Sequence, residues 1–246
     1  MRFAQVKEEP AQRAGDTEQN AYPNPAAGVH NGRNAKGLPT HPSSQSPRLT
    51  TIRPMTKLLV FAGSTRQHSF NRQLAHAAAA LARTAGAEVT HLELSTLDIP
   101  LYNADLEAQG TPPDVIRLKE IMDAHPAWII CSPEYNGSYT GLLKNTIDWA
   151  SSPVKGHPVW ADGSKPFEGK VVGLLSASNG ALGGLRSLSH LNPLMQNLQC
   201  WVAPRQFALG RAAQAFDEHG VLQDEAHRHG VQAVVDQVLW ATHRLG

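Results

Sequence analysis

The sequence has few cysteines, no long apolar run and almost no net charge, and each shortage excludes a class of protein. Only Cys131 and Cys200 are present, far apart and in apolar contexts, so we expect a reducing, cytoplasmic location and no disulfide scaffold. No apolar run approaches the roughly 20 residues of a membrane span, and the amino terminus lacks a signal-peptide core. Lys and Arg number 22 against 21 Asp and Glu, which argues against nucleic acid or a membrane surface as a partner.

Several conspicuous residues indicate ordinary structural roles. The 12 His are scattered without ligand spacing, so the sequence predicts no bound metal, and His227 and His229 fall on the solvated face of a predicted helix. Cys131 fits a small buried apolar residue better than a nucleophile. Lys144 and Asp148 are four residues apart, which predicts a helix-surface pair.

The first 55 residues differ in composition from the rest. They are rich in Pro, Gly, Asn, Gln and Arg and have almost no periodic apolar residues, so they predict a disordered extension. A start codon placed too early is an alternative, because Met55 directly precedes the first apolar run. A transit peptide fits less well, since Glu8, Glu9 and other acids are out of place in a presequence. Residues 56–246 are ample for one domain with a single core.

From residue 57 onward, apolar runs alternate with segments of helical spacing. The runs predict strands at 58–62, 89–94, 127–131, 171–175 and between 200 and 209. Helical spacing predicts helices around 74–82, 114–123, 142–150, 185–198 and 231–239, the fourth kinked by Pro193. Residues 97–110 and 176–184 are predicted loops, and 155–168 a surface insertion. Five strands alternating with helices indicate an open parallel sheet covered on both faces.

The loop after the first strand indicates a phosphate site. Residues 63–71 read Gly-Ser-Thr-Arg-Gln-His-Ser-Phe-Asn and end where a helix begins. A helix start offers unpaired N–H groups and partial positive charge, and hydroxyls from Ser64 and Ser69 with the donors of Arg66 would complete a pocket for a phosphate monoester. Taken alone, the same residues also fit an ordinary cap at Ser69 and a solvated Arg66.

A second polar loop follows the third strand. Residues 131–149 run from the strand through Pro133, Asn136 and Gly137 into a helix with apolar residues at helical spacing. In the flavodoxin-like strand order 2-1-3-4-5, the first and third strands are neighbours, and a flavin occupies the crevice between their loops. The two loops together therefore predict a flavodoxin-like three-layer α/β/α sandwich with a flavin site.

These motifs resemble those of the NADPH-dependent FMN reductases, the flavodoxin-like NAD(P)H oxidoreductases that include quinone, azo-dye and chromate reductases. The resemblance covers residues 56–245. It is strongest at 63–71, at Ser-Pro-Glu-Tyr-Asn-Gly-Ser (132–138) and at Gly-Leu-Leu-Lys-Asn-Thr-Ile-Asp-Trp (141–149), and weaker at Leu-Leu-Ser-Ala-Ser-Asn-Gly (174–180). Asn179 departs from the family, which often has Pro there, and the 155–168 insertion is longer than usual.

The resemblance implies which residues bind FMN. The phosphate would contact Ser64, Arg66, Ser69 and Asn71, next to Phe70. The isoalloxazine would lie against Pro133, Glu134, Tyr135, Asn136 and Gly137, largely through backbone groups. Ser176, Asn179 and Gly180 would close the third side. No catalytic acid or base is required, because the flavin carries its own redox chemistry.

The expected function is FMN-dependent transfer of electrons from NADPH or NADH to a small acceptor such as a quinone, azo compound, metal oxyanion or free flavin. The family also implies a homodimer or homotetramer. A non-catalytic flavodoxin-type electron carrier is the alternative, although such carriers are usually strongly acidic and have a Thr-rich phosphate loop, whereas this chain has Arg66 and almost no net charge. A flavin-binding regulatory protein is the third interpretation.

Overall fold

The computed structural model describes residues 55–246, so the predictions made for residues 1–54 lie outside the described residues. The strands are β1 (Lys57–Ala62), β2 (Glu88–Leu92), β3 (Ala127–Cys131), β4 (Val171–Ala177), β5 (Trp201–Val202) and β6 (Phe207–Leu209). The helices are α1 (Phe70–Thr84), α2 (Ala104–Gln109), α3 (Pro113–Asp123), α4 (Gly141–Ala150), α5 (Leu185–Asn197) and α6 (Glu225–Leu245), with short 3-10 turns at Leu94–Thr96 and Ala212–Gln214.

The strands form one parallel sheet in the order β2-β1-β3-β4-β5, which confirms the predicted order. Leu58 of β1 pairs with Val89 of β2 on one side and with Ala127 of β3 on the other. β1 therefore lies inside the sheet and β2 at its edge.

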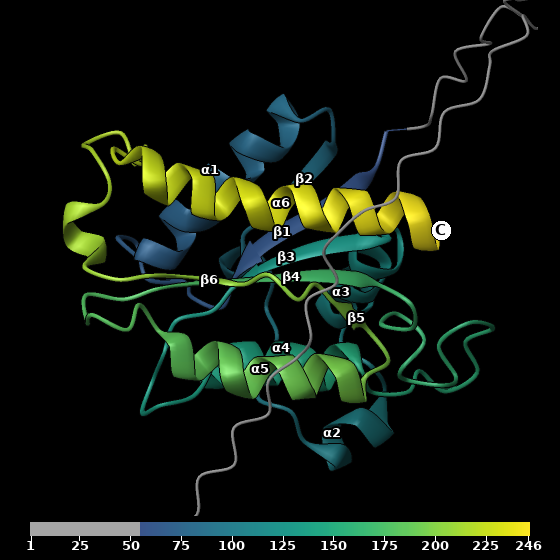
Figure 1. Cartoon of the computed structure of the whole chain (residues 1–246). Helices are drawn as coiled ribbons and strands as arrows, with labels where there is room; N and C mark the ends of the chain where they lie inside the picture. Colours follow the sequence, from purple (N-terminus) through teal and green to yellow (C-terminus); the bar gives the residue numbers. More distant parts are fainter. Residues whose placement is uncertain (1–54) are drawn as a thin grey trace, which may run out of the picture. The chain divides into compact units, whose positions relative to one another are not determined.

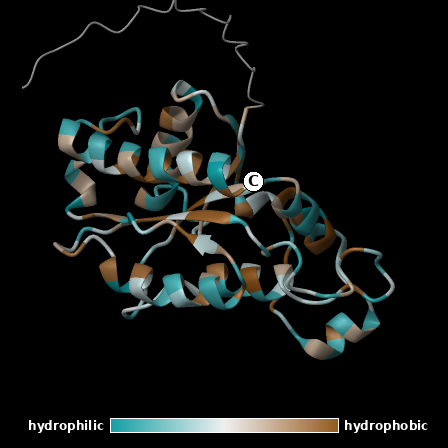
Figure 2. Ribbon diagram, turned by 45° about the vertical axis from the view of Figure 1, so that its right-hand side comes forward, coloured by the Kyte–Doolittle hydropathy of each residue, from teal (hydrophilic) through white to brown (hydrophobic). Residues whose placement is uncertain are grey.

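Helices cover both faces of the sheet, as the continuous apolar runs predict. In Figure 1, α1 and α6 lie on one side of the strands, and α4 and α5 lie on the other. Leu58 and Val60 pack in the core beneath α1 and α6, whereas Leu59 and Phe61 pack with α3, α4 and α5. Figure 2 shows the consequence in hydropathy, with brown strands between helices whose outer faces are mostly teal.

Helix α1 ends in a glycine cap. Gly86 has φ +86°, and its N–H bonds the carbonyl of Arg83 while Ala87 bonds that of Ala82. This pair of bonds is the Schellman pattern, in which a left-handed residue directly follows the helix.

Three predicted boundaries are wrong. The predicted loop 97–110 contains α2, whose first turn is capped by the Asn103 side chain. β4 continues through Ser176 to Ala177, because the Ser176 hydroxyl donates to the Gly183 carbonyl and so can be buried. The fifth strand is divided into β5 and β6, both of which pair with β4. The division arises because the four residues 203–206 lie opposite only two residues of β4, and because Pro204 has no N–H to donate to the ladder.

The predicted insertion 155–168 has no helix or strand, but it is more than a surface loop. Trp160 is buried, and Phe167 packs edge-to-face on Trp128 beneath the sheet. α5 continues past Pro193 to Asn197, and a kink there stays a prediction. Within residues 55–246, no helix has both the length and the apolar character that crossing a bilayer requires.

Candidate functional site

A cleft of about 310 Å³ lies at the carboxyl ends of β1, β3 and β4, the position where doubly wound sheets bind ligands. It is lined by Ser64, Arg66, Ser69, Phe70, Asn71, Pro133, Glu134, Tyr135, Ala177, Ser178 and Asn179. The cleft thus brings together residues predicted from all three loops. Asn136, Gly137, Ser176 and Gly180, which were also predicted to bind the cofactor, are not among its lining residues.

The first loop leads into the amino end of α1. Ser69 is the N-cap, and its hydroxyl accepts a long hydrogen bond (3.4 Å) from the N–H of Arg72. Ser69 therefore caps α1, as one of its two predicted roles requires, and it also lines the cleft. Arg66 is exposed, with its guanidinium carbon 5.7 Å from the centre of the Phe70 ring. In residues 55–246 no carboxylate lies within ion-pair distance of Arg66, so its donors face solvent and the cleft.

Arg72 braces this loop from behind. Its Nη1 donates to the carbonyls of Arg66 (3.3 Å) and Gln67 (3.4 Å), and its Nε donates to Glu93 at 2.8 Å. Sequence reasoning missed this residue. A cation in the first turn of a helix opposes the helix dipole, so its presence indicates a specific partner and could have identified it.

Asn71 fixes the start of α1 to the end of β4. Its amide nitrogen donates to the Ala177 carbonyl at 2.8 Å, and its amide oxygen accepts from the Ala177 N–H at 2.9 Å. The side chain is buried, and both its polar atoms are used in these bonds. Asn71 therefore positions the first and third loops relative to each other, and a direct phosphate contact from it stays a prediction.

The second loop folds into a tight turn. Tyr135 and Ser138 exchange two main-chain hydrogen bonds of 2.8 and 3.1 Å, and both central residues have positive φ, +52° at Asn136 and +81° at Gly137. These values are those of a type I′ turn, for which Asn-Gly is the preferred sequence. Asn136 and Gly137 thus shape the loop, while Tyr135, 58% exposed, is presented at the cleft.

The second loop is also anchored to α5 and to the first loop. Glu134 forms an ion pair with Arg186 and accepts the N–H of the same residue at 3.1 Å, near the positive end of α5. Thr140, the N-cap of α4, accepts from the Leu143 N–H and donates to the Gly63 carbonyl at 2.7 Å. Sequence reasoning missed Thr140, although a threonine before a helical apolar run is a capping signal.

The third loop differs most from its prediction. The Ser176 hydroxyl points to the Gly183 carbonyl, so this buried residue does not face the cleft. Ala177 and Ser178 occupy the wall in its place, because β4 extends two residues beyond the predicted end. Asn179 also lines the cleft, and its side-chain oxygen accepts the Ala213 N–H at 2.9 Å.

The cleft contains no acid–base dyad. Glu134 is its only lining carboxylate in the described part of the chain, and that group is paired with Arg186. Cys131, beside the second loop, is fully buried, and burial raises the pKa of its thiol far above the ordinary value. Cys131 is therefore an inert core residue, as predicted. Lys144 and Asp148 form the predicted pair along α4.

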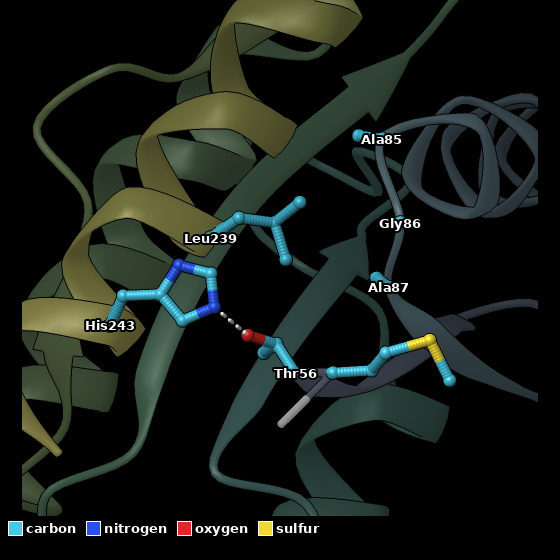
Figure 3. A pocket seen from close by; sticks show the side chains of 7 residues that line it. Thr56, Ala85, Gly86, Ala87, Leu239 and His243 are labelled. Carbon is cyan, nitrogen blue, oxygen red and sulfur yellow. Dashed lines mark hydrogen bonds between the residues drawn. The ribbon is translucent and has the colours of Figure 1, made fainter. Parts of the chain in front are cut away.

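A smaller pocket, of about 120 Å³, lies before β1, and Figure 3 shows it from close by. Thr56 and His243 form a hydrogen bond of 2.7 Å across it, between the hydroxyl and Nε2. Ala85, Gly86, Ala87 and Leu239 supply little further polar chemistry. It is lined by no Lys or Arg and by none of the predicted site residues, whereas the 310 Å³ cleft is lined by Arg66 and by residues of all three predicted loops, so that cleft is the candidate site.

A doubly wound parallel sheet with a polar cleft at the carboxyl ends of β1, β3 and β4 is typical of the class of α/β proteins that bind a ligand at this edge. Residues 56–214 match the family described as NADPH-dependent FMN reductase. The chain belongs to this family, which confirms the predicted resemblance. It is therefore an oxidoreductase that uses FMN with NAD(P)H as donor.

Known relatives cover most of the described chain. An NAD(P)H:quinone oxidoreductase from Solanum tuberosum is 37% identical over 188 residues, which are 74% of this chain and 90% of the relative. An NAD(P)H-dependent FMN reductase from Pseudomonas aeruginosa is 34% identical, with 77% of this chain and 97% of the relative covered. Among solved structures, a flavoenzyme NAD(P)H:(acceptor) oxidoreductase from Paracoccus denitrificans has a TM-score of 0.67 and 28% identity, and covers 78% of this chain and 100% of its own.

Proposed function

We propose that the cleft binds FMN and that the protein uses it to reduce a quinone or a similar small acceptor with electrons from NADPH or NADH. The observation that carries the proposal is the meeting of three loops, after β1, β3 and β4, around one polar cleft. The relatives named quinone oxidoreductases and quinone reductases support a quinone as acceptor. Azo compounds, metal oxyanions and free flavin are acceptors of the same redox class.

The residues present fit FMN at both ends. Arg66, the Ser64 hydroxyl and the first turn of α1 supply positive charge and donors at one end, as a phosphate requires. Pro133 and Tyr135 supply flat apolar surface at the other, as a fused ring requires. The volume lies near the lower end of the range for small-molecule sites, roughly 300–1,000 Å³.

The protein's own contribution is binding, orientation and solvent exclusion. FMN, when bound, supplies the hydride and electron chemistry. Arg66 would hold the phosphate, and the turn at Asn136 and Gly137 would present the backbone of Glu134 and Tyr135 to the ring. Ala177 and Ser178 would close the third side. Glu134, paired to Arg186, anchors the second loop to α5.

The absorbance spectrum of the protein as isolated, followed by anaerobic stopped-flow mixing with NADPH and with NADH, tests this function. Bound flavin should bleach with at least one nucleotide and recover its colour when a benzoquinone is added. Flavin that binds but never bleaches would leave the electron carrier as the better interpretation. A protein that does not bind added FMN would overturn the proposal.

We also propose a homodimer or homotetramer in the cytoplasm. Both cysteines are buried and free, as a reducing compartment predicts. Several large apolar side chains are exposed, among them Tyr135, Leu182 and Leu185, and a second subunit would cover such surface. Sedimentation equilibrium of the purified chain tests the oligomeric state, and a monomer at micromolar concentration would contradict it.

A further inference from the structure

Three side chains that the proposed flavin chemistry does not use meet beside the edge strand. His76 comes from α1, His91 from β2, and Glu93 lies directly after β2. His76 Nε2 is 3.4 Å and His91 Nδ1 is 3.8 Å from Oε1 of Glu93, and one ligand atom from each residue lies within 4.8 Å of the others. Within residues 55–246, this is the one group of three such side chains close enough to share an ion.

The two oxygens of Glu93 have different environments. Oε2 accepts the hydrogen bond from Arg72 at 2.8 Å, whereas Oε1 is buried and accepts none. A buried carboxylate oxygen without a partner is costly and requires an explanation. Oε1 is also the atom that both imidazoles approach, so a cation placed between the three residues would satisfy it.

The two imidazoles are suited to share a metal ion. Their ring centres are 4.2 Å apart. One nitrogen of each ring lies within 4.8 Å of the other and of a Glu93 oxygen, so both imidazoles can approach the same ion.

We propose that His76, His91 and Glu93 bind one divalent transition-metal ion of the zinc class, with a fourth position open to water. Two ligands at about 2.0–2.1 Å from a tetrahedral ion are roughly 3.3 Å apart, and the separations from Glu93 of 3.4 and 3.8 Å are close to that. Two imidazoles and one carboxylate suit Zn²⁺, Co²⁺ or Ni²⁺ better than Mg²⁺ or Ca²⁺, which prefer oxygen ligands. The side chain of His76 is 61% exposed, which gives the ion an entry path.

Arg72 connects this metal site to the first loop of the cleft. It hydrogen-bonds Glu93, the carboxylate ligand, with Nε and the carbonyls of Arg66 and Gln67 with Nη1. Groups that hydrogen-bond a metal ligand tune the site, and the coupling is reciprocal. A bound ion would offset the charge of Glu93, leaving more of the positive charge of Arg72 to act on an anion held by the loop.

The binding experiment uses the untagged full chain, freed of metal with a chelator and titrated calorimetrically with Zn²⁺. The test variant is His76→Ala, which removes an exposed ligand and leaves the core intact; His91→Ala is the second variant. The matched control is His229→Ala, because His229 also faces a carboxylate, Glu225 at 3.7 Å, but has no second imidazole in its group. Circular dichroism checks that each variant folds.

We expect the wild type and His229→Ala to bind one Zn²⁺ alike, and His76→Ala to bind it about tenfold or more weakly. Co²⁺ in place of Zn²⁺ should give visible absorption bands of a tetrahedral ion, and these bands should be lost in His76→Ala and His91→Ala. If the three variants and the wild type bind Zn²⁺ equally, the metal site is overturned.

The connection through Arg72, which rests on the proposed function, has its own test. Saturating Zn²⁺ should tighten FMN binding by about two- to tenfold and leave riboflavin binding unchanged, and the Zn²⁺ effect should vanish in His76→Ala. An unchanged FMN affinity, in a protein that binds both Zn²⁺ and FMN, would overturn the connection alone. Failure to bind FMN with or without Zn²⁺ would instead count against the proposed function.

Discussion

The two loops on either side of the cleft are held in place in different ways. The first loop, residues 64–69, makes few bonds of its own and is held by Arg72, which donates to the carbonyls of Arg66 and Gln67 from α1. Asn71 fixes the start of the same helix to Ala177 of β4. The second loop is rigid in itself, with a type I′ turn at residues 135–138 and an ion pair from Glu134 to α5. The first loop therefore offers charge, and the second offers shape.

This difference suggests that the first loop recognises the phosphate of the ligand and the second loop recognises the ring. Changes in the first loop should affect FMN, which has a phosphate, more than riboflavin, which has none. Changes in the second loop should affect both ligands alike, because both contain the ring. Groups that fix the loops from the core should affect the stability of the fold as well.

Replacing Asn71 with Ala should have the largest effect, because this residue aligns the first loop with the third. The variant leaves the N–H and carbonyl of Ala177 without partners in a buried place. We expect the free energy of unfolding to fall by about 2–4 kcal/mol, and FMN and riboflavin to bind more weakly. Urea unfolding and fluorescence titration measure the two effects.

Asn145→Ala is the matched control. Asn145 also makes two main-chain bonds, accepting from the Tyr102 N–H and donating to the Pro100 carbonyl, but it does not line the cleft. It should lose stability and keep its flavin affinity within about twofold. Equal losses of flavin affinity in both variants would show that Asn71 has no special role at the cleft.

Lys119 holds the far end of α4, the helix that follows the second loop. Its side chain is completely buried and donates to the carbonyls of Ala150 and Ser152 at 2.7 and 2.6 Å. Burial lowers the pKa of Lys119 from 10.5 to about 8. Between about pH 8 and pH 10.5 the unfolded chain binds more protons than the folded chain, so Lys119 makes the free energy of unfolding rise with pH. Below about pH 8 Lys119 is charged in both states, and the full cost of burying that charge lowers the stability.

Comparing wild type with Lys119→Met isolates this contribution. The stability of the wild type relative to the variant should be about 2 kcal/mol greater at pH 9.5 than at pH 7, since all other groups titrate in both proteins. Urea unfolding at the two pH values measures the difference. Within residues 55–246 no buried lysine fixes the first loop. A relative stability independent of pH would therefore remove this contrast between the two sides of the cleft.

The elements that position the site could be predicted from local sequence. Continuous apolar runs predict β1, β3 and β4, and turn residues directly after two of them predict the loops of the cleft. The end of β4 could not be predicted, because Ser176 is polar and is buried only through a bond to Gly183, seven residues away. Because the end of β4 was predicted too early, Ser176 and Gly180 were assigned to the third wall of the cleft, whereas Ala177 and Ser178 form it.

Contacts between distant segments were not predictable either. Thr140 reaches the Gly63 carbonyl across 77 positions of the chain, and no local pattern records that bond. His76 is likewise distant in sequence from His91 and Glu93, and it meets them because α1 packs beside β2. His227, predicted to be solvated, is half-buried near Phe207 because α6 packs beside β6.

Arg66→Ala tests the charged loop directly. Loss of a charged hydrogen bond, worth roughly 1.5–3 kcal/mol, should weaken FMN binding by about tenfold or more and riboflavin binding much less. Arg83→Ala, at the other end of α1, is the control and should bind both ligands as the wild type does. If Arg66→Ala weakened FMN and riboflavin equally, the phosphate would have to lie elsewhere.

Arg186→Met should have the smallest effect and tests the rigid loop. The Arg186 side chain is 65% exposed, so its pair with Glu134 is worth at most about 1 kcal/mol. We expect FMN and riboflavin affinities to fall together by about two- to fivefold, because the turn loses a brace but keeps its own hydrogen bonds. Lys144→Met breaks an exposed pair that does not line the cleft and should change neither affinity. A loss confined to FMN in Arg186→Met would show that the second loop also responds to the phosphate, and the division between charge and shape would fail.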